Sequence, residues 1–205
     1  MEMAMNLMPL NDSRARRLKA LTTGTHDRLD QAIMAADPFG SRSRYADFLK
    51  VQYLFHRDIA ALYQNPDLDH LLPDLAGRRR LEAVAQDMAD MGVTEIQGLA
   101  ADPLRFSAGT ETDLPTALGW LYVAEGSSLG AAFLLKFAAK LGLNPDFGAR
   151  HLAPADEGRG LHWRTFTAAL DAIDLTPDED ERVVAGAQEA FVKVHSLVRR
   201  FLSGS

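Results

Sequence analysis

The chain has 205 residues, of which 47% are apolar and 24% charged, and its formal net charge is −6. This length suits one well-packed domain, and no linker rich in proline, glycine or serine divides it. We expect a single domain over residues 1–205, with residues 1–11 disordered. The mild acidity argues against a general nucleic-acid binder. The absence of cysteine excludes disulfides, cysteine-ligated zinc and iron–sulfur clusters.

Two helices are predicted at the start of the chain. Asp12 or Ser13 can cap the first, over residues 14–22 (RARRLKALT). The sequence TTGT at residues 22–25 then predicts a break and a fresh cap for a second helix over residues 26–37 (HDRLDQAIMAAD). A proline and a glycine shortly after this second helix end it.

The rest of the chain is also predicted to be helical, because apolar positions recur every three and four residues. The capping and helix-ending residues predict helices over residues 44–65, 77–92, 114–137, 160–173 and 177–202. Ser41 or Ser43 can cap the first of these, and Asp113 caps the third, with Pro115 in its first turn. The stretch TPDED at residues 176–180 is predicted to cap the last. Residues 93–111 have weak periodicity and are predicted to be a connection. The sequence therefore predicts an all-α fold.

The segment over residues 117–138 is apolar enough to suggest a membrane span. Glu125 and Lys136 lie inside it, and charged residues are costly in the middle of a bilayer. The first residues, MEMAMNLMPLNDS, have neither a basic leader nor the apolar core of a signal peptide. We therefore expect a cytoplasmic protein that does not contact a membrane.

Among the six histidines, none is in an HExxH pattern or a close histidine pair that would indicate zinc. His26 is distinctive because it opens its predicted helix and Asp30 follows four residues later on the same face. A carboxylate there could hold Nδ1 of the imidazole and leave Nε2 free to bind a metal. The alternative is an ordinary surface histidine with an acidic neighbour.

Other polar positions also allow two interpretations. Lys19 lies seven residues before His26, so the two share a face if the helix continues through TTGT. The basic run around Lys19 could then bind carboxylates near His26, or it is a solvated face. Gln52 and His56 are four residues apart in an apolar row, and they face either a wet pocket or the surface.

The apolar helix that carries Glu125 also contains Gly126 and Gly130, although each glycine inside a helix costs roughly 1 kcal/mol relative to alanine. These glycines could let two helices pack closely. They could instead let the backbone approach a large flat ligand. Ser127 and Ser128 between them are weak candidates for a nucleophile, because EGSSLG is not GxSxG.

The segments THDRLD, FLKVQYLF and GWLYVAEGSSLGAAFL occur in this order and at these separations. In these segments the chain resembles bacterial haem oxygenases. The resemblance extends from about residue 12 to residue 200, and EGSSLGAAF is its most specific part. The resemblance implies a helical fold that holds haem b between a proximal helix and a kinked distal helix. It also implies an enzyme that uses O2 to oxidise haem to biliverdin, ferrous iron and carbon monoxide.

The resemblance assigns roles to residues on both sides of the haem. His26 matches the proximal iron ligand, and Asp30 stands where glutamate is common in the family, so we expect a water between Asp30 and His26. Gly126 and Gly130 match the glycines of the distal helix, which let the backbone lie against the haem and leave room for dioxygen. Ser127, between these glycines, is expected to contribute to haem binding.

Further matches concern the haem propionates and proton delivery. Lys19 and Tyr122 match positions that contact the propionates in members with the usual haem orientation, which implies cleavage at the α-meso carbon and biliverdin IXα as the product. Gln52 and His56 match positions near the distal water network, which implies a supporting role in proton delivery.

No predicted strand is followed by GxGxxG, so the sequence offers no flavin or nicotinamide site of its own. An external electron donor, either a ferredoxin or an NAD(P)H-dependent reductase, is therefore implied, and we expect a monomer. Two alternatives remain at this point. One is a haem-binding or haem-trafficking protein that keeps the His26 ligand without degrading haem. The other is a helical interaction protein in which the glycines only pack helices.

Overall fold

The computed structural model describes residues 13–93 and 103–202. Within these residues every regular element is a helix, apart from isolated bridge pairing at Asn144, which confirms the all-α prediction. The elements are α1 (Arg14–Ala35), α2 (Arg42–Asp58), η1 (Ala60–Gln64), α3 (Pro66–Leu71), η2 (Ala76–Arg78), α4 (Leu81–Asp90), α6 (Leu114–Lys140), η3 (Arg150–Leu152), α7 (Arg159–Ala172) and α8 (Pro177–Leu202), where η denotes a 3-10 helix.

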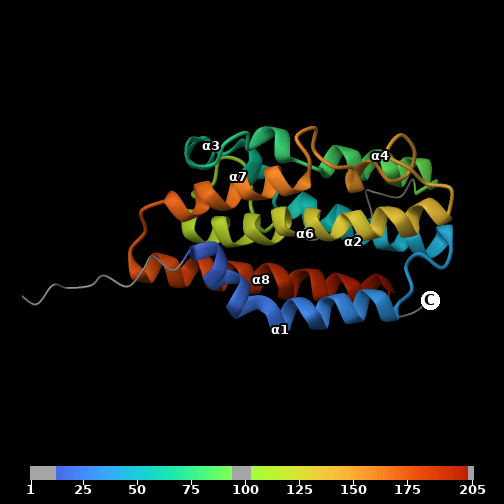
Figure 1. Cartoon of the computed structure of the whole chain (residues 1–205), viewed down its shortest axis with the longest axis horizontal. Helices are drawn as coiled ribbons and strands as arrows, with labels where there is room; N and C mark the ends of the chain where they lie inside the picture. The colour runs from blue at the N-terminus through green and yellow to red at the C-terminus, as the bar shows by residue number, and fades with distance from the viewer. Residues whose placement is uncertain (1–12, 94–102, 203–205) are drawn as a thin grey trace, which may run out of the picture.

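The long helices run roughly along one axis and form layers (Figure 1). α1 and α8 lie along one side of the molecule, α6 and α2 occupy the middle, and α7, α3 and α4 cover the opposite side. α6 packs mainly against α8, and α8 also contacts α1 and α2. Because α6 lies in the middle, it contacts α8 on one side and α7 on the other.

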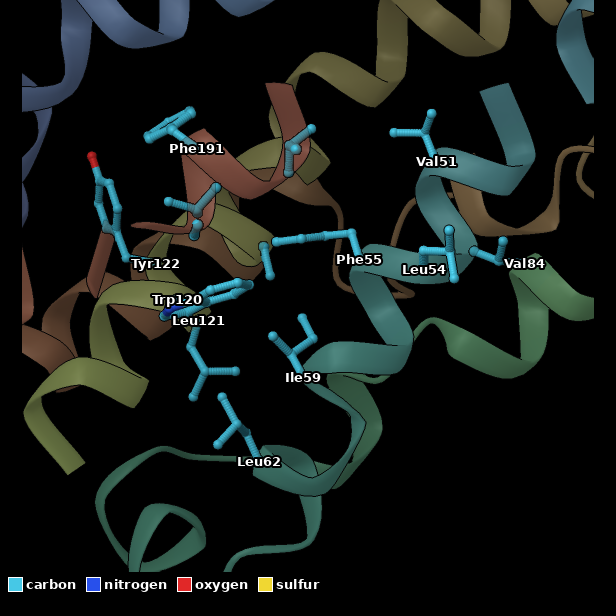
Figure 2. Packing of buried hydrophobic residues seen from close by; sticks show 14 of the residues in the cluster. Val51, Leu54, Phe55, Ile59, Leu62, Val84, Trp120, Leu121, Tyr122 and Phe191 are labelled. Carbon is cyan, nitrogen blue, oxygen red and sulfur yellow. The ribbon is translucent and has the colours of Figure 1, made fainter. Parts of the chain in front are cut away.

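One hydrophobic cluster joins these layers. Phe55 of α2 stacks on Trp120 of α6, with 5.8 Å between the ring centroids. Figure 2 shows Ile59 and Leu121 extending the same cluster next to this pair. A single core of this kind is typical of one domain.

α1 is one helix, so the predicted break at residues 22–25 is wrong. Thr22 Oγ1 donates to the carbonyl of Leu18 at 2.7 Å. Thr23 Oγ1 donates to the carbonyl of Lys19 at 2.6 Å. Hydroxyls that bond to the carbonyl four residues back are satisfied inside a helix. The threonines therefore continue the first helix and do not cap a second one.

Two other predicted helices are divided. The helix expected over residues 44–65 is α2 followed by the tighter η1, because α-helical hydrogen bonding ends at Asp58. The helix expected over residues 77–92 begins as α4 only at Leu81, since the chain before it forms η2. Gly92, with φ of 74°, lies just after α4 and ends the helical stretch as predicted.

Predicted caps are confirmed at several helices. The side chains of Ser13, Ser41 and Asp113 each accept from the backbone amide three residues later. Before α8, the Thr176 amide donates to Glu179 Oε2 at 2.8 Å and the Glu179 amide donates to Thr176 Oγ1 at 3.3 Å. This reciprocal pair is a capping box and fixes where α8 begins.

α6 satisfies the length and composition of a membrane span, and it is the one helix in residues 13–93 and 103–202 to do so. Half of its most apolar window, 50%, is buried inside the protein. Its first half, from Pro115 to Glu125, is almost entirely buried against other helices. This packing supports the prediction of a core helix.

Two predictions fall wholly or partly on residues that the structure does not describe. Residues 1–11, expected to be disordered, lie outside the described residues. So do residues 94–102 of the connection expected over residues 93–111. The described part of that connection, residues 103–111, has turns and bends without a helix.

Candidate functional site

His26 lies in the middle of α1, on the surface, and not in a first helical turn as the sequence predicted, because α1 begins twelve residues earlier at Arg14. Its side chain is 55% exposed, and Nδ1 lies 3.3 Å from Asp30 Oδ2 and 3.9 Å from Asp27 Oδ1. Its ring also meets the edge of Phe191 of α8, with centroids 6.0 Å apart. Because both carboxylates face Nδ1, Nε2 is left for another ligand.

Asp30 reaches His26 directly, at 3.3 Å, so the expected bridging water is not needed. Partial burial raises the pKa of Asp30, while the positive charge that His26 can carry opposes this shift and Asp27 adds to it. The pair is therefore electrostatically linked as well as close. A carboxylate in this position fixes the orientation of the imidazole ring.

Lys19 is exposed on α1. Since α1 continues through TTGT, the condition for a shared face is met: seven residues are about two helical turns, so Lys19 and His26 point to nearly the same side. Tyr122 lies on α6, buried except for 8% of its surface, with its ring 5.5 Å from that of Trp163. Figure 2 shows the Tyr122 hydroxyl pointing away from Trp120 and Leu121.

Gly126 and Gly130 do not bring helices together. A Cβ at Gly126 would meet the ring of Trp163 at 3.5 Å, an ordinary contact, and a Cβ at Gly130 would have nothing within 4 Å. The close-packing interpretation of these two glycines is therefore wrong. The open space in front of Gly130 is what the approach of a ligand requires.

Close packing of helices is instead the role of Gly119 in α6 and Gly186 in α8. A Cβ at Gly119 would lie 2.1 Å from the carbonyl oxygen of Val183. A Cβ at Gly186 would lie 2.3 Å from the carbonyl oxygen of Thr116. This pair was not predicted, although a glycine inside each of the two helices was visible in the sequence.

The two serines after Glu125 bond to their own helix. Ser127 Oγ donates to the carbonyl of Ala124 at 2.6 Å, and Ser128 Oγ donates to the carbonyl of Glu125 at 2.7 Å. Both hydroxyls are therefore bonded to backbone carbonyls and not to a histidine or carboxylate that could activate them, which argues against a nucleophile. Bonds of this kind favour a bend in a helix.

A small polar cavity lies beside α6, between α2, η2, η3 and α7. Its volume is about 70 Å³, and polar groups in its wall include Gln52, His56, Arg78, Glu125, His151 and His162. Gln52 and His56 therefore face a pocket, as one of the two interpretations predicted. Burial, together with the charges of His151 and Arg80, lowers the pKa of His56 to about 3, so this imidazole is neutral at physiological pH.

A buried charged cluster in the cavity wall was not predicted. Arg78 Nη1 donates to Glu125 Oε2 at 2.9 Å, and the Tyr63 hydroxyl donates to Glu125 Oε1 at 3.2 Å. His162 Nε2 lies 3.3 Å from Glu125 Oε2, and its Nδ1 lies 2.7 Å from Glu157 Oε1. A carboxylate inside an apolar helix was the one available signal for this cluster.

A second acid–imidazole pair opens on the same cavity. His151 Nδ1 lies 2.7 Å from Asp87 Oδ2, and Asp87 is fully buried. Burial would raise the pKa of Asp87, but hydrogen bonds from His151 and Arg150 lower it below its ordinary value. Within residues 13–93 and 103–202, neither Nε2 of His151 nor Nδ1 of His56 has a hydrogen-bond partner. Buried polar atoms in proteins are hydrogen-bonded, so each of these nitrogens is expected to bind a water or another ligand in the cavity.

The buried pair of Arg78 and Glu125 gives a stability prediction. Arg78→Met is expected to lower the free energy of unfolding by about 3–5 kcal/mol, because it leaves the Glu125 carboxylate buried without its guanidinium partner. The double variant Arg78→Met with Glu125→Gln should recover most of this loss. Urea unfolding of both proteins without haem measures the difference. Equal unfolding free energies for the wild type and the single variant would contradict the prediction.

Among the described residues, no group of three or more histidines and carboxylates is arranged to hold a metal ion. A metal bound through His26 would therefore need the rest of its coordination from another molecule, as iron in a porphyrin has. The residues around His26 are compatible with such a ligand, since the imidazole is exposed and oriented by Asp30.

Comparison with known proteins gives consistent matches. A family model described as heme oxygenase matches residues 12–200. Heme oxygenase PigA of Pseudomonas aeruginosa is 42% identical over 187 residues, which cover 91% of this chain and 92% of that protein. The NO- and CO-bound heme oxygenase from Neisseria meningitidis is 41% identical and superposes with a TM-score of 0.82, over 95% of this chain and 94% of that chain.

A more distant structure shares the fold. Heme oxygenase-1 from the cyanobacterium Synechocystis, in complex with heme, is 16% identical and has a TM-score of 0.71, over 92% of this chain and 91% of that chain. The sequence matches exclude the alternatives of a haem carrier and of a helical interaction protein. The chain belongs to the heme oxygenase family and is a haem-degrading oxygenase.

Proposed function

We propose that this protein binds haem b between α1 and α6, ligates the iron through His26 and cleaves the macrocycle at the α-meso carbon. The products are biliverdin IXα, ferrous iron and carbon monoxide. The observation that carries the proposal is an exposed imidazole whose Nδ1 is held by Asp30 at 3.3 Å, with Nε2 left for the iron. That arrangement is usual for a ligating histidine.

The exposed surface of α6 is suited to binding a flat apolar ligand. Leu129 is 41% exposed and Phe133 is 68% exposed, on either side of Gly130 in the sequence. Large exposed apolar side chains around a glycine with open space in front of it suit the face of a porphyrin. Gly126 and Gly130 let the helix backbone cover that face, and Ser127 contributes a polar group between them.

Bound haem supplies the iron at which dioxygen is reduced and the carbon framework that is oxidised. The protein supplies position and protons. The glycines of the distal helix leave room for dioxygen, and Gln52 and His56 orient water in the cavity beside α6. The neutral His56, with its pKa lowered to about 3, can accept or donate hydrogen bonds without attracting a counter-ion.

His56→Ala is expected to slow haem turnover, because it removes a group that orders water beside the distal helix. We expect a decrease of roughly tenfold, smaller than the loss on removing a residue that transfers a proton directly. The measurement is the rate of haem loss after a reductase system is added to the haem complex. Unchanged turnover would end the assignment of His56 to proton delivery.

Regiochemistry depends on how the haem is turned about its iron. We assign Lys19 and Tyr122 to the propionates, since Lys19 shares a face of α1 with His26 and a lysine attracts a carboxylate. Chromatography of the bilin formed in a complete reaction tests the orientation. Biliverdin IXα as the main product is expected, and a predominance of the β or δ isomer would refute this orientation.

The reaction also needs electrons. We propose that a ferredoxin or an NAD(P)H-dependent reductase supplies them, because the sequence has no nucleotide-binding motif of its own. We further propose that the enzyme works in the cytoplasm as a monomer. Light scattering of the haem complex measures the oligomeric state, and a mass of two chains would overturn this part of the proposal.

A further inference from the structure

We propose that Glu157, His162 and Glu125 form a proton entry path that connects solvent to the cavity beside the distal helix. The proposal rests on the haem cleavage proposed above, in which dioxygen is reduced to water and protons are consumed. The proposed route of these protons from solvent to the cavity crosses the layer formed by α7 and α6. The three residues lie in series across this layer.

The outer half of the path is a contact between an exposed and a buried group. The Glu157 side chain is 41% exposed, whereas the His162 side chain is only 6% exposed. Glu157 Oε1 lies 2.7 Å from Nδ1 of His162, a hydrogen-bond distance. Glu157 can therefore take up a proton from water and lies close enough to pass it to the imidazole.

The inner half leads from the imidazole to the cavity. Nε2 of His162 lies 3.3 Å from Oε2 of Glu125, whose side chain is 5% exposed. Glu125 and His162 both contribute to the cavity wall, together with Gln52 and His56. The imidazole thus has a carboxylate on each ring nitrogen, one on the solvent side and one on the cavity side.

The cavity can continue the path. A volume of about 70 Å³ is enough for several waters, and the walls carry the polar partners that buried water needs. Nδ1 of His56 and Nε2 of His151 have no partner among the residues that the structure describes, and both residues line this space. Water in the cavity would satisfy these nitrogens and carry protons from Glu125 towards His56.

The transfer is balanced atom by atom. The Glu157 carboxyl gives its proton to Nδ1 of the neutral ring, and the ring gives its Nε2 proton to Glu125 Oε2. Glu125 then passes a proton to cavity water and is a carboxylate again. The imidazole ends as the Nδ1–H tautomer. It returns to the Nε2–H tautomer when the ring turns about its Cβ–Cγ bond, gives the Nδ1 proton to water on the solvent side and takes one from that water at Nε2, so no proton is taken back from the cavity and the cluster is unchanged after each transfer.

Four charged or titratable groups act on His162 or its partners: Glu125, Glu157, Arg78 and Tyr63. The interaction with Glu125 raises the pKa of His162, burial opposes this, the bond to Glu157 raises it again, and the charge of Arg78 lowers it. Burial raises the pKa of Tyr63, which therefore remains a hydrogen-bond donor to Glu125. A raised pKa makes the His162 ring readier to take up a proton from Glu157.

The first test uses the protein without haem and is independent of catalysis. NMR titration of the His162 ring is expected to show a lower pKa in Glu157→Gln than in the wild type, because the variant keeps a hydrogen-bonding side chain but loses the charge. Glu82→Gln is the control, since it removes a carboxylate whose ion-pair partner is Arg79, 2.7 Å away and three residues earlier in the chain. An unchanged His162 pKa in Glu157→Gln would overturn the coupling on which the path depends.

The second test measures haem consumption by the haem complex at several pH values, in H2O and in D2O. Glu157→Gln is expected to be about a hundredfold slower than Glu82→Gln at neutral pH. The difference should shrink at acidic pH and be larger in D2O, while both variants keep the wild-type melting temperature and haem affinity. His162→Gln, which can still bond to both carboxylates, should be slower again.

The outcomes separate the two proposals. A wild type that does not consume haem would overturn the proposed function and the path with it. An active wild type with equal rates, pH profiles and isotope effects in Glu157→Gln and Glu82→Gln would overturn the path alone. Slower turnover that follows a lower melting temperature, with an unchanged pH profile, would show a purely structural cluster and also overturn it.

Discussion

His26→Ala is expected to abolish conversion of haem to biliverdin. The variant removes the only group of α1 that we assign to the iron, while the exposed position of His26 means that the fold loses little packing. The measurement is an aerobic optical spectrum of the protein with one equivalent of haem, followed over time after a reductase system is added. In the wild type the Soret band should disappear as the broad absorption of biliverdin grows, and in the variant neither change should occur.

Two further variants control this experiment. His70→Ala removes another exposed helix histidine, on α3, and should leave turnover unchanged. Asp30→Ala keeps the ligand but removes the carboxylate that orients it, and should weaken haem binding about tenfold. Normal turnover in His26→Ala would refute the ligand assignment. A wild-type spectrum of bound haem that never decays would contradict cleavage itself.

The fold could be predicted from the sequence where the signals are local. The caps at Ser13, Ser41 and Asp113, and the capping box before α8, are determined by residues within three positions of each other. Such contacts depend little on the rest of the protein, so the sequence is sufficient to place them. The beginnings of these four helices were therefore predicted within two residues.

The errors in the predicted helix boundaries occur where one residue can take part in either of two favourable local structures. Thr22 and Thr23 can cap a new helix or bond back to the carbonyl four residues earlier, and the sequence cannot choose between the two. Burial of Thr22 against the core chooses the continuous helix. Likewise, the buried contact of Arg78 with Glu125 accompanies the replacement of the expected start of a helix by η2. Contacts between distant segments decide both cases.

The candidate site divides in the same way. The pairing of His26 with Asp30 is local, four residues along one helix, and the structure brings the two side chains together. The cluster around Glu125 joins residues 63, 78 and 162, which the sequence separates by up to 99 positions between its first and last member. No periodicity relates such residues. Their proximity follows only from the packing of α6 against α7 and the turns beside it.

The glycines of α6 give the clearest contrast between stability and catalysis. Gly119→Ala is expected to destabilise the protein by about 3 kcal/mol or more, because its Cβ would lie 2.1 Å from the backbone carbonyl of Val183 and only a movement of α8 could relieve the clash. Gly130→Ala should leave stability unchanged or raise it by up to about 1 kcal/mol, since alanine favours a helix and nothing lies within 4 Å.

For the rate of haem turnover we expect the opposite order, with the larger effect at Gly130. Gly130→Ala places a methyl group where we expect the haem face and dioxygen, and Gly130→Leu fills more of that space, so turnover should fall by about tenfold in the first and further in the second, where tenfold corresponds to about 1.4 kcal/mol of barrier. Urea unfolding without haem and the rate of haem loss with a reductase system measure the two quantities on the same samples. If Gly130→Leu consumed haem at the wild-type rate, the open space in front of Gly130 would have no part in the reaction, and the distal face would have to lie elsewhere on α6. If Gly119→Ala were as stable as the wild type, α6 and α8 could move apart at little cost. In that case α6 would not be a helix that packing fixes at one end and that stays open at its centre for the substrate.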